Sequence, residues 1–297
     1  MFWKYGEKMQ KKEKSCDLHT HTVHSDGTLT PRELVSEAKR IGLSAIALTD
    51  HNTTAGLDEF MRLAAENELE AAAGVEFSTE YDGRELHLIG LFSDPQHYSA
   101  VMEFIGDLKE RKNQANRELI KKLGALGYEI DYDALIASTP DGYVNRAHIA
   151  VDMLRRGYVD TVSEAFDRFL SEKTGYYVSP PKPALFDTIE FIDSIGAVSI
   201  LAHPLLQLSR EELRALLLRD ECRKLASIEV LYGKYSEEDR SFSWDLCREL
   251  SLLPSGGSDF HGENKPGQML GTGKGDLLVP YEFYLRLKER AQTLGHK

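Results

Sequence analysis

Nine side chains of the types that bind metal ions lie at or just beyond the ends of short apolar runs in this chain. They occur in motifs such as Asp17-Leu-His-Thr-His21 and Ser258-Asp-Phe-His261. Strands of a barrel deliver side chains to one rim, where a cluster of histidines and carboxylates has little use except to hold metal ions. The nine candidate ligands are His19, His21, Asp26, His51, Glu76, His87, His203, Asp259 and His261.

The prediction of a metal cluster rests on all nine residues together, because each motif alone is a weak signal. His19 and His21, two residues apart on an extended strand end, point to the same face and can hold one cation. A pair of surface histidines with ordinary partners would show the same spacing. Six of the ten histidines, however, fall at or just beyond predicted strand ends, which favours a metal cluster.

The elements that position these residues are seven apolar runs, which we predict to be strands. They span residues 15–19, 44–50, 70–77, 84–92, 197–203, 226–231 and 251–259. Helical patterns over residues 31–41, 54–67, 185–195, 209–219, 236–250 and 281–294 separate most of them or close the chain. The first of these patterns has Thr30 as N-cap, Pro31 at its first position and Glu33 completing a capping box. Alternating strands and helices imply a parallel sheet in a closed or nearly closed α/β barrel.

A helical insertion interrupts this alternation. The segment 96–183 is charged, helical in pattern and punctuated by glycines, and Val178-Ser-Pro-Pro-Lys-Pro183 marks the return to the barrel. We therefore predict an N-terminal tail over 1–14, the first part of the barrel over 15–95, the insertion as a cap over 96–183, and the second part of the barrel over 184–297.

Composition narrows the function further. The formal net charge of −12 disfavours a stable complex with long nucleic acid. It is compatible with local basic pockets that bind small phosphates. No apolar run approaches the length of a membrane span, and the N-terminus has no apolar core of a signal peptide, so we expect a cytoplasmic protein. The cysteines are Cys16, Cys222 and Cys247, with no CxxC pair, which predicts buried reduced thiols.

On these motifs the chain resembles the PHP (polymerase and histidinol phosphatase) superfamily, and within it the stand-alone bacterial phosphoesterases that act on nucleotides. The resemblance covers about residues 15–297, because the insertion motifs Asn145-Arg-Ala-His148 and Phe166-Asp-Arg-Phe-Leu170 also match. It implies a distorted (β/α)7 barrel that holds two or three divalent ions at the carboxyl ends of its strands. Imidazoles and carboxylates suit Mn²⁺, Fe²⁺ or Zn²⁺.

The resemblance also divides the ligands, with Glu76, Asp259 and His203 taken as the catalytic residues. It implies a first site of His19, His21, Glu76 and Asp259, a second of Glu76, His87 and His203, and a third of Asp26, His51 and His261. Glu76 would bridge the first two ions. His24 is an alternative to Asp26 in the third site. Asp17 and Asp50 are expected to orient imidazoles from behind the ligands.

Substrate contacts are expected from the insertion. Arg146 is the main candidate, because a guanidinium binds phosphate oxygens bidentately, and His148 and Lys173 are further candidates. The basic stretch with Lys109, Lys112 and Lys121 is interleaved with acidic and apolar residues, and we interpret it as a solvated helix face.

The function predicted from these features is a metal-dependent phosphoesterase. Its substrate would be the phosphate monoester of a small nucleotide, such as a nucleoside 3′,5′-bisphosphate, with short oligonucleotide ends as a further substrate. The alternatives are a histidinol phosphate phosphatase, a non-catalytic metal-binding module, and a hydrolase of C–N bonds. The oligomeric state is left open.

Overall fold

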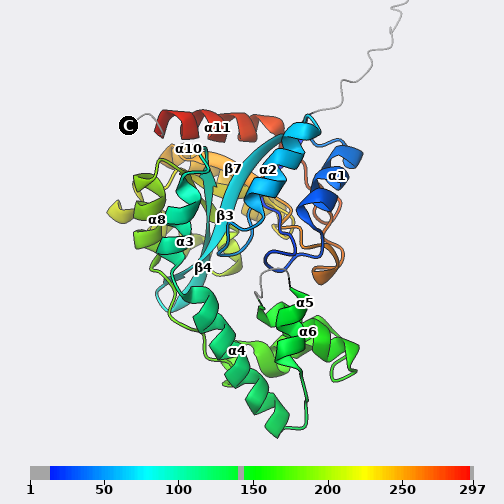
Figure 1. Ribbon diagram of the computed structural model, residues 1–297. Helices are drawn as coiled ribbons and strands as arrows, with labels where there is room; N and C mark the ends of the chain where they lie inside the picture. Colours follow the sequence, from blue (N-terminus) through cyan, green and yellow to red (C-terminus); the bar gives the residue numbers. More distant parts are fainter. Residues whose placement is uncertain (1–13, 140–143, 295–297) are drawn as a thin grey trace, which may run out of the picture.

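The computed structural model describes residues 14–139 and 144–294, and its centre is one curved sheet of eight strands (Figure 1). The strands lie in the order β7-β6-β5-β4-β3-β2-β1-β8. They are β1 (Ser15–Asp17), β2 (Ala45–Leu48), β3 (Glu70–Tyr81), β4 (Arg84–Phe92), β5 (Val198–Ala202), β6 (Ser227–Tyr232), β7 (Leu253–Gly257) and β8 (Val279–Pro280). All seven predicted strands are therefore present, and β8 is an additional short strand antiparallel to β1.

The sheet curls into a nearly closed barrel because the segments that follow β1 and β7 meet. The amide of Leu18 donates to the carbonyl of Gly256 at 3.2 Å, and the amide of Asp259 donates to the carbonyl of His19 at 2.9 Å. Gly257 permits this approach, since a Cβ there would lie 2.4 Å from the Cβ of His19. The two ends of the chain that carry ligand motifs are thus joined at one rim.

The expectation of a wholly parallel sheet is wrong at β4, which pairs antiparallel with both β3 and β5. A two-residue turn at Asp82 and Gly83 joins β3 to β4, and both residues have positive φ (52° and 71°). Asp-Gly is a favoured sequence for such hairpin turns, so the sequence contained the signal. The reversal places His87 near the start of its strand while it still reaches the same rim as the other ligands.

Helices cover the outside of the barrel and one of its ends. They are α1 (Pro31–Ile41), α2 (Leu57–Glu66), α8 (Leu185–Ser194), α9 (Arg210–Leu217), α10 (Glu237–Leu250) and α11 (Tyr281–Leu294), with short turns η3 (Pro204–Leu206), η4 (Asp220–Cys222) and η5 (Gly262–Asn264). The bounds and capping box predicted for α1 are confirmed. Figure 1 shows α11 lying across the end of the barrel away from the insertion.

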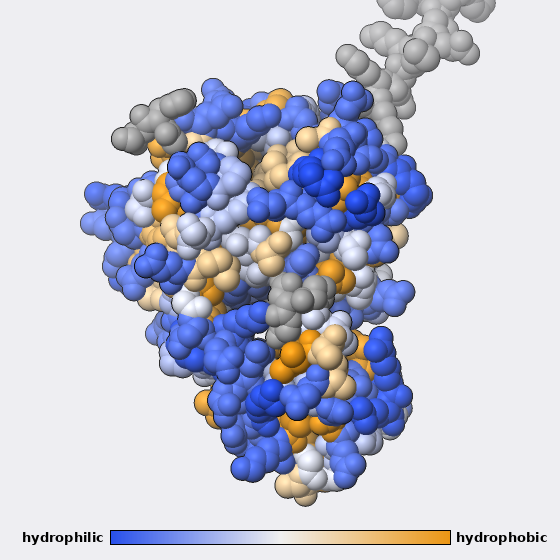
Figure 2. All heavy atoms as spheres, viewed as in Figure 1, coloured by the Kyte–Doolittle hydropathy of each residue, from blue (hydrophilic) through white to orange (hydrophobic). Residues whose placement is uncertain are grey.

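The segment between β4 and α8 contains α3 (His97–Ile105), α4 (Leu108–Ala125), α5 (Tyr132–Ser138), α6 (Arg146–Arg155), α7 (Val162–Ala165), the π-helical turn η1 (Phe166–Leu170) and the 3₁₀ turn η2 (Glu172–Thr174). Val101 and Ile105 of α3 pack into the barrel core. Leu119, Ile149 and Phe169 instead belong to a second core. Helices α4, α5 and α6 project from the barrel (Figure 1), and Figure 2 shows apolar residues over α5 and α6 beside a largely hydrophilic α4.

The three cysteines are buried and free, as predicted. Among the described helices, none has the length and apolar character needed to cross a membrane. Of the expected N-terminal tail, only Lys14 lies within the described residues.

Candidate metal centre

The nine candidate ligands come together at the rim of the barrel that faces the insertion. They come from the segments after β1 (His19, His21 and Asp26), β2 (His51), β5 (His203) and β7 (Asp259 and His261), and from within β3 (Glu76) and β4 (His87). Parallel strands that end at the same edge explain most of this convergence. The antiparallel strand β4 contributes from its beginning, where His87 lies beside Ser78 of β3.

The carboxylate of Glu76 is fully buried at the middle of the cluster. Its two oxygens lie 2.8–3.2 Å from the nearest nitrogens of five imidazoles, with His19, His21 and His51 around Oε2 and His87 and His203 around Oε1. A carboxylate with both oxygens directed at separate sets of imidazoles is suited to bridge two cations.

Two further carboxylates complete the cluster. Asp259 Oδ1 lies 3.4 Å from His21 Nε2 and 3.3 Å from His261 Nδ1. Asp26 Oδ1 lies 3.1 Å from His261 Nε2. His24, the alternative to Asp26, directs its ring against Gly56, so Asp26 is the residue that reaches the other ligands.

The donor atoms fit divalent cations. Four groups of three or four ligand atoms lie within 4.8 Å of one another in the described residues. Several of these atoms are buried without a hydrogen-bond partner there, namely His19 Nε2, His21 Nε2, His51 Nδ1, His261 Nε2 and Glu76 Oε2. Buried polar atoms of this kind are costly unless something binds them, and divalent cations would satisfy all of them at once.

The charges within the cluster shift the pKa values of its members strongly. Burial alone would raise the pKa of Glu76, but His51 and His19 outweigh it and hold the pKa well below its usual range. Burial alone would lower the pKa of the histidines, yet the carboxylates of Asp259 and Glu76, 3.4 and 3.2 Å from its Nε2, raise the pKa of His21 to about 9. The charge of Glu76 likewise raises the pKa of His87 to about 10. Metal binding must therefore displace protons.

A buried acid that sequence reasoning missed, Glu229 on β6, holds two of the ligands. Its Oε1 accepts from His19 Nδ1 at 2.9 Å, and its Oε2 accepts from the backbone amide of His203 at 2.6 Å. Glu229 is fully buried in the apolar run Ser227–Tyr232. An acid inside such a run was a signal in the sequence, because a buried carboxylate needs specific partners.

Asp17 and Asp50 do not orient imidazoles, which corrects the expectation for them. Asp17 accepts hydrogen bonds from the amides of Ser258 and Gly271 at 2.9 and 2.8 Å. Asp50 accepts from the amide of Thr22 at 2.8 Å. Both acids therefore fix the backbone of the loops that carry the candidate ligands. The acids that contact imidazoles from behind are Glu229 at His19 and Glu85 at His87, the latter at 3.3 Å.

Two ligands sit in unusual backbone conformations. His203 and Asp259 have positive φ, 31° and 54°. Residues other than glycine avoid this region, and such strain is maintained where the surrounding contacts over-determine it. For Asp259 those contacts include Oδ2, which accepts from Tyr232 Oη at 2.9 Å and from Lys265 Nζ at 2.7 Å.

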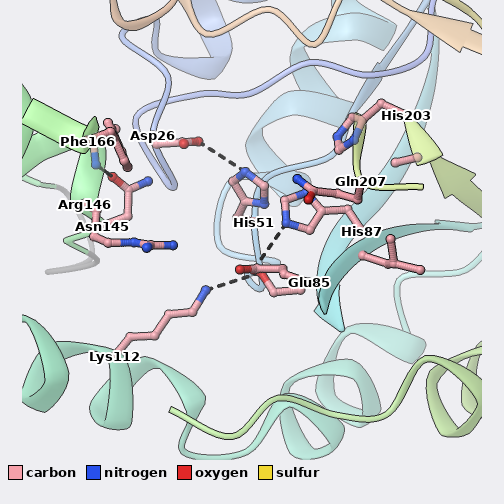
Figure 3. Close-up of a pocket in the computed structure, with 14 residues that line it drawn as sticks. Asp26, His51, Glu85, His87, Lys112, Asn145, Arg146, Phe166, His203 and Gln207 are labelled. Atoms are coloured by element: carbon pink, nitrogen blue, oxygen red, sulfur yellow. Dashed lines mark hydrogen bonds and ion pairs between the residues drawn. The ribbon is translucent and has the colours of Figure 1, made fainter. Parts of the chain in front are cut away.

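A cavity of about 260 Å³ lies between the metal cluster and the insertion. His51, His87 and His203 line one side, and Figure 3 shows Arg146 and Lys112 extending toward them from α6 and α4. The cavity therefore places two cations opposite the metal ligands. Other lining residues include Asp26, Ser78, Glu85, Asn145, Phe166 and Gln207.

Arg146 is held in place by its own neighbours. Its Nη1 donates to the carbonyl of Leu170 at 3.1 Å, and its guanidinium carbon lies 4.3 Å from the centroid of the buried Tyr177 ring. The remaining guanidinium nitrogens can bind an anion in the cavity. Tyr177 thus serves as a platform for this arginine.

Lys112 departs from the interpretation of its helix as a solvated face. It lines the cavity and donates to Ser78 Oγ at 3.3 Å. Its charge and that of Lys182 also act on Glu85, and with His87 they lower the pKa of Glu85 well below its usual range against the effect of burial. Lys112 lies in a sequence of alternating charges, which by itself does not single it out.

The other two predicted substrate residues lie away from the lining. His148 is partly buried on α6, where its Nδ1 accepts from the amide of Asn145 at 3.1 Å and closes a capping box. Lys173 is exposed on η2 and is not among the residues that line the cavity. Substrate contacts of His148 and Lys173 stay predictions.

Known proteins resemble this chain over most of its length. A sequence model of the PHP domain matches residues 17–178. The chain is 34% identical over 251 residues to a 5′-3′ exoribonuclease of Haemophilus influenzae, covering 84% of this chain and 90% of that protein. It is 30% identical over 261 residues to a 3′,5′-nucleoside bisphosphate phosphatase of Chromobacterium violaceum, covering 86% and 90%. A solved structure from Bifidobacterium adolescentis, described as a metal-dependent phosphoesterase, aligns with TM-score 0.81 at 29% identity, covering 93% of this chain and 96% of that one.

Proposed function

Because this chain belongs to the PHP domain family and is a metal-dependent phosphoesterase, we propose that it acts on small nucleotides. The proposed reaction is hydrolysis of the phosphate monoester of a nucleoside 3′,5′-bisphosphate or a similar compound. Release of nucleotides from the ends of short oligonucleotides is a second activity of the same site. Both substrate classes correspond to the names of similar proteins.

The observation that carries this proposal is the cavity with metal ligands on one wall and cations on the other. A phosphate held between Arg146 and the cluster would have charge compensation on two sides. Phe166 lines the same cavity and offers an aromatic surface to a nucleoside. The volume of about 260 Å³ favours a single nucleotide or a chain end over the interior of a duplex.

We assign the ligands to three sets within this proposal. The first set is His19, His21, Glu76 and Asp259, the second is Glu76, His87 and His203, and the third is Asp26, His51 and His261. The ligand atoms that lie within 4.8 Å of one another also connect these sets, with His21 beside the third set, His19 beside Glu76 and His203, and His51 beside Glu76 and His87. Divalent ions bound there would supply Lewis acidity and an activated water for attack on phosphorus. Glu76 would bridge the first two sets, since its two oxygens face different imidazoles.

The protein residues contribute orientation and charge. Arg146, fixed by Leu170 and Tyr177, would orient the phosphate, and Lys112 would add positive charge from α4. Glu229 keeps His19 and His203 in position through hydrogen bonds to both. Glu76, Asp259 and His203 are the residues that we propose as catalytic, through their contacts with the reacting centre.

A phosphate-release screen tests the proposal. Metal-free protein is reconstituted with Mn²⁺, Fe²⁺ or Zn²⁺ and offered nucleoside 3′,5′-bisphosphates, mononucleotides, histidinol phosphate and an amide substrate. We expect the highest kcat/KM for the bisphosphate. A preference for histidinol phosphate or for the amide would replace this proposal. If chelation lowered Tm while no loaded form released phosphate, the metal would serve structure and the catalytic proposal would be wrong.

A further inference from the structure

The rim of the barrel carries a second group of cations on the side away from the cavity. The cavity lies along the arc from β2 to β5, which provides His51, Ser78, His87 and His203. The opposite arc is formed by the segments that follow β6 and β7, and these contain Lys234, Lys265 and Lys274. We call these three residues the lysine patch.

Backbone contacts bring the lysine patch together. Gly233 and Gly273 touch, since a Cβ at Gly233 would lie 3.2 Å from the Cα of Gly273 and 3.8 Å from the amide nitrogen of Lys274. The residues that follow these two glycines are Lys234 and Lys274, so the two lysines leave adjacent points of the rim. Paired hydrogen bonds between Met269 and Gly273, 2.7 and 2.8 Å long, stabilise the loop that presents Lys274.

Lys265 connects this patch to the metal cluster, because its Nζ lies 2.7 Å from Asp259 Oδ2. Lys234 and Lys274 are exposed, and neither forms an ion pair within the described residues. Asp276, two residues from Lys274, pairs with Arg240 at 2.8 Å. Asp259 compensates the charge of Lys265, whereas Lys234 and Lys274 add positive charge to this rim without an ion-pair partner in the part of the chain that the structure describes.

This charge is unusual for its location. The protein has a net charge of −12, yet three lysines gather beside a cluster that gains positive charge whenever it binds divalent ions. Lys234 and Lys274 leave the rim at adjacent points, where burial and the charges of Lys265 and Lys274 lower the pKa of Lys234 while the charge of Asp259 raises it. A polyanion that spans the rim would relieve the repulsion between these lysines.

We propose that the lysine patch binds the backbone phosphates of a short single-stranded oligonucleotide whose terminal nucleotide occupies the cavity. This inference rests on the proposed function and specifies how a chain end would be held. The strand crosses the metal cluster from the β2–β5 arc to the β6–β7 arc, so the terminal phosphate and the following phosphates meet different cations. A nucleoside 3′,5′-bisphosphate contains only phosphate monoesters and no phosphodiester backbone, so its binding does not depend on the patch.

The test uses the double variant Lys234→Ala/Lys274→Ala of the full chain, loaded with Mn²⁺. Lys265 is left intact because it contacts Asp259. KM is measured for a 5′-phosphorylated tetraribonucleotide and for a nucleoside 3′,5′-bisphosphate at several salt concentrations. We expect KM for the tetranucleotide to rise roughly tenfold, as two exposed ion pairs are lost, with KM for the bisphosphate unchanged. The slope of log KM against log salt should fall by about 1.4, or about 0.7 for each phosphate contact.

Matched variants separate a specific site from general charge loss. Lys39→Ala/Lys121→Ala removes the same charge from exposed helical positions and should behave as wild type. Lys234→Arg/Lys274→Arg should retain tetranucleotide binding. Fluorescence anisotropy with a labelled tetranucleotide and metal-free protein should show the same ranking without turnover.

Three outcomes would overturn the assignment of the patch. They are an unchanged tetranucleotide KM, an equal loss in the control pair, and an equal loss for the bisphosphate. If wild type hydrolyses the bisphosphate but neither binds nor hydrolyses the tetranucleotide, the patch assignment fails while the proposed phosphatase activity stands. If wild type acts on neither substrate, both fail.

Discussion

Glu229→Gln is expected to weaken metal binding 10- to 100-fold while leaving the fold intact. Glu229 is fully buried, and its two oxygens accept from His19 Nδ1 and from the amide of His203. Because a carboxylate only accepts, the Nδ1 of His19 must carry the proton, and Nε2 then presents its lone pair toward Glu76 and Asp259. This tautomer is the one that a metal ion requires.

Glutamine has nearly the same shape but only one accepting oxygen. If that oxygen accepts from His203, the amide NH₂ faces His19 Nδ1 and drives the ring proton to Nε2, where it blocks coordination. If the oxygen instead accepts from His19, the NH₂ opposes the amide of His203 and leaves a buried donor without a partner. Either arrangement costs about 1–3 kcal/mol.

The same magnitude follows from metal affinity. Loss of a residue that orients a ligand typically lowers metal affinity 10- to 100-fold. Each factor of ten corresponds to about 1.4 kcal/mol, so the range is about 1.4–2.8 kcal/mol and agrees with the cost of the misplaced hydrogen bond. Glu229→Asp keeps both acceptors on a shorter side chain and should lie between Glu229→Gln and wild type.

The assay is competition for Zn²⁺ or Mn²⁺ between metal-free protein and a chromophoric chelator, with circular dichroism as the check on folding. Glu211→Gln, at an exposed position of α9, is the matched control and should bind metal as wild type does. Wild-type affinity in folded Glu229→Gln would refute the tautomer argument. An equal loss in Glu211→Gln would show that the effect comes from net charge.

Three further predictions concern the ligands and the cavity. Glu76→Ala and Asp259→Ala should each abolish phosphate release and lower bound metal measured by atomic emission, and near-wild-type kcat in either would contradict the cluster. Arg146→Ala should raise KM for a phosphoester about 10- to 100-fold, because charge-assisted hydrogen bonds contribute about 1.5–3 kcal/mol, whereas an unchanged KM would remove its assignment to phosphate. Metal-free protein should lose stability as pH rises from about 6.5 through 9 to 10, because the raised pKa values of His21 and His87 stabilise the fold only while the rings are protonated. Urea midpoints at pH 7.5, 8.5 and 9.5 measure this loss, above the range in which the lowered pKa values of His51 and His261 act in the opposite direction, and a midpoint that rises across this range would contradict it.

Local sequence determined the elements that depend on local interactions. The capping box of Thr30 and Glu33 and the αL residue Gly42 bound helix α1 at both ends, and the predicted bounds match the structure. The seven apolar runs form strands β1 to β7, whose apolar side chains are largely buried in the barrel. Ligand types could also be read from the sequence, since clustered histidines and carboxylates have a narrow range of uses.

Tertiary structure alone decided which residues meet. The Asp82-Gly83 turn is a local signal for the direction of β4, but only the paired sheet shows that His87 reaches the rim from near the start of that strand. The partners of Glu229 come from the segments that follow β1 and β5, and no local sequence pattern predicts them. Lys112 lines the cavity only because the fold places α4 beside β3, where its side chain contacts Ser78. The residue types in the sequence therefore predict which chemistry is available. Contacts between residues far apart in the sequence determine which atoms take part in it, because these contacts depend on the whole fold.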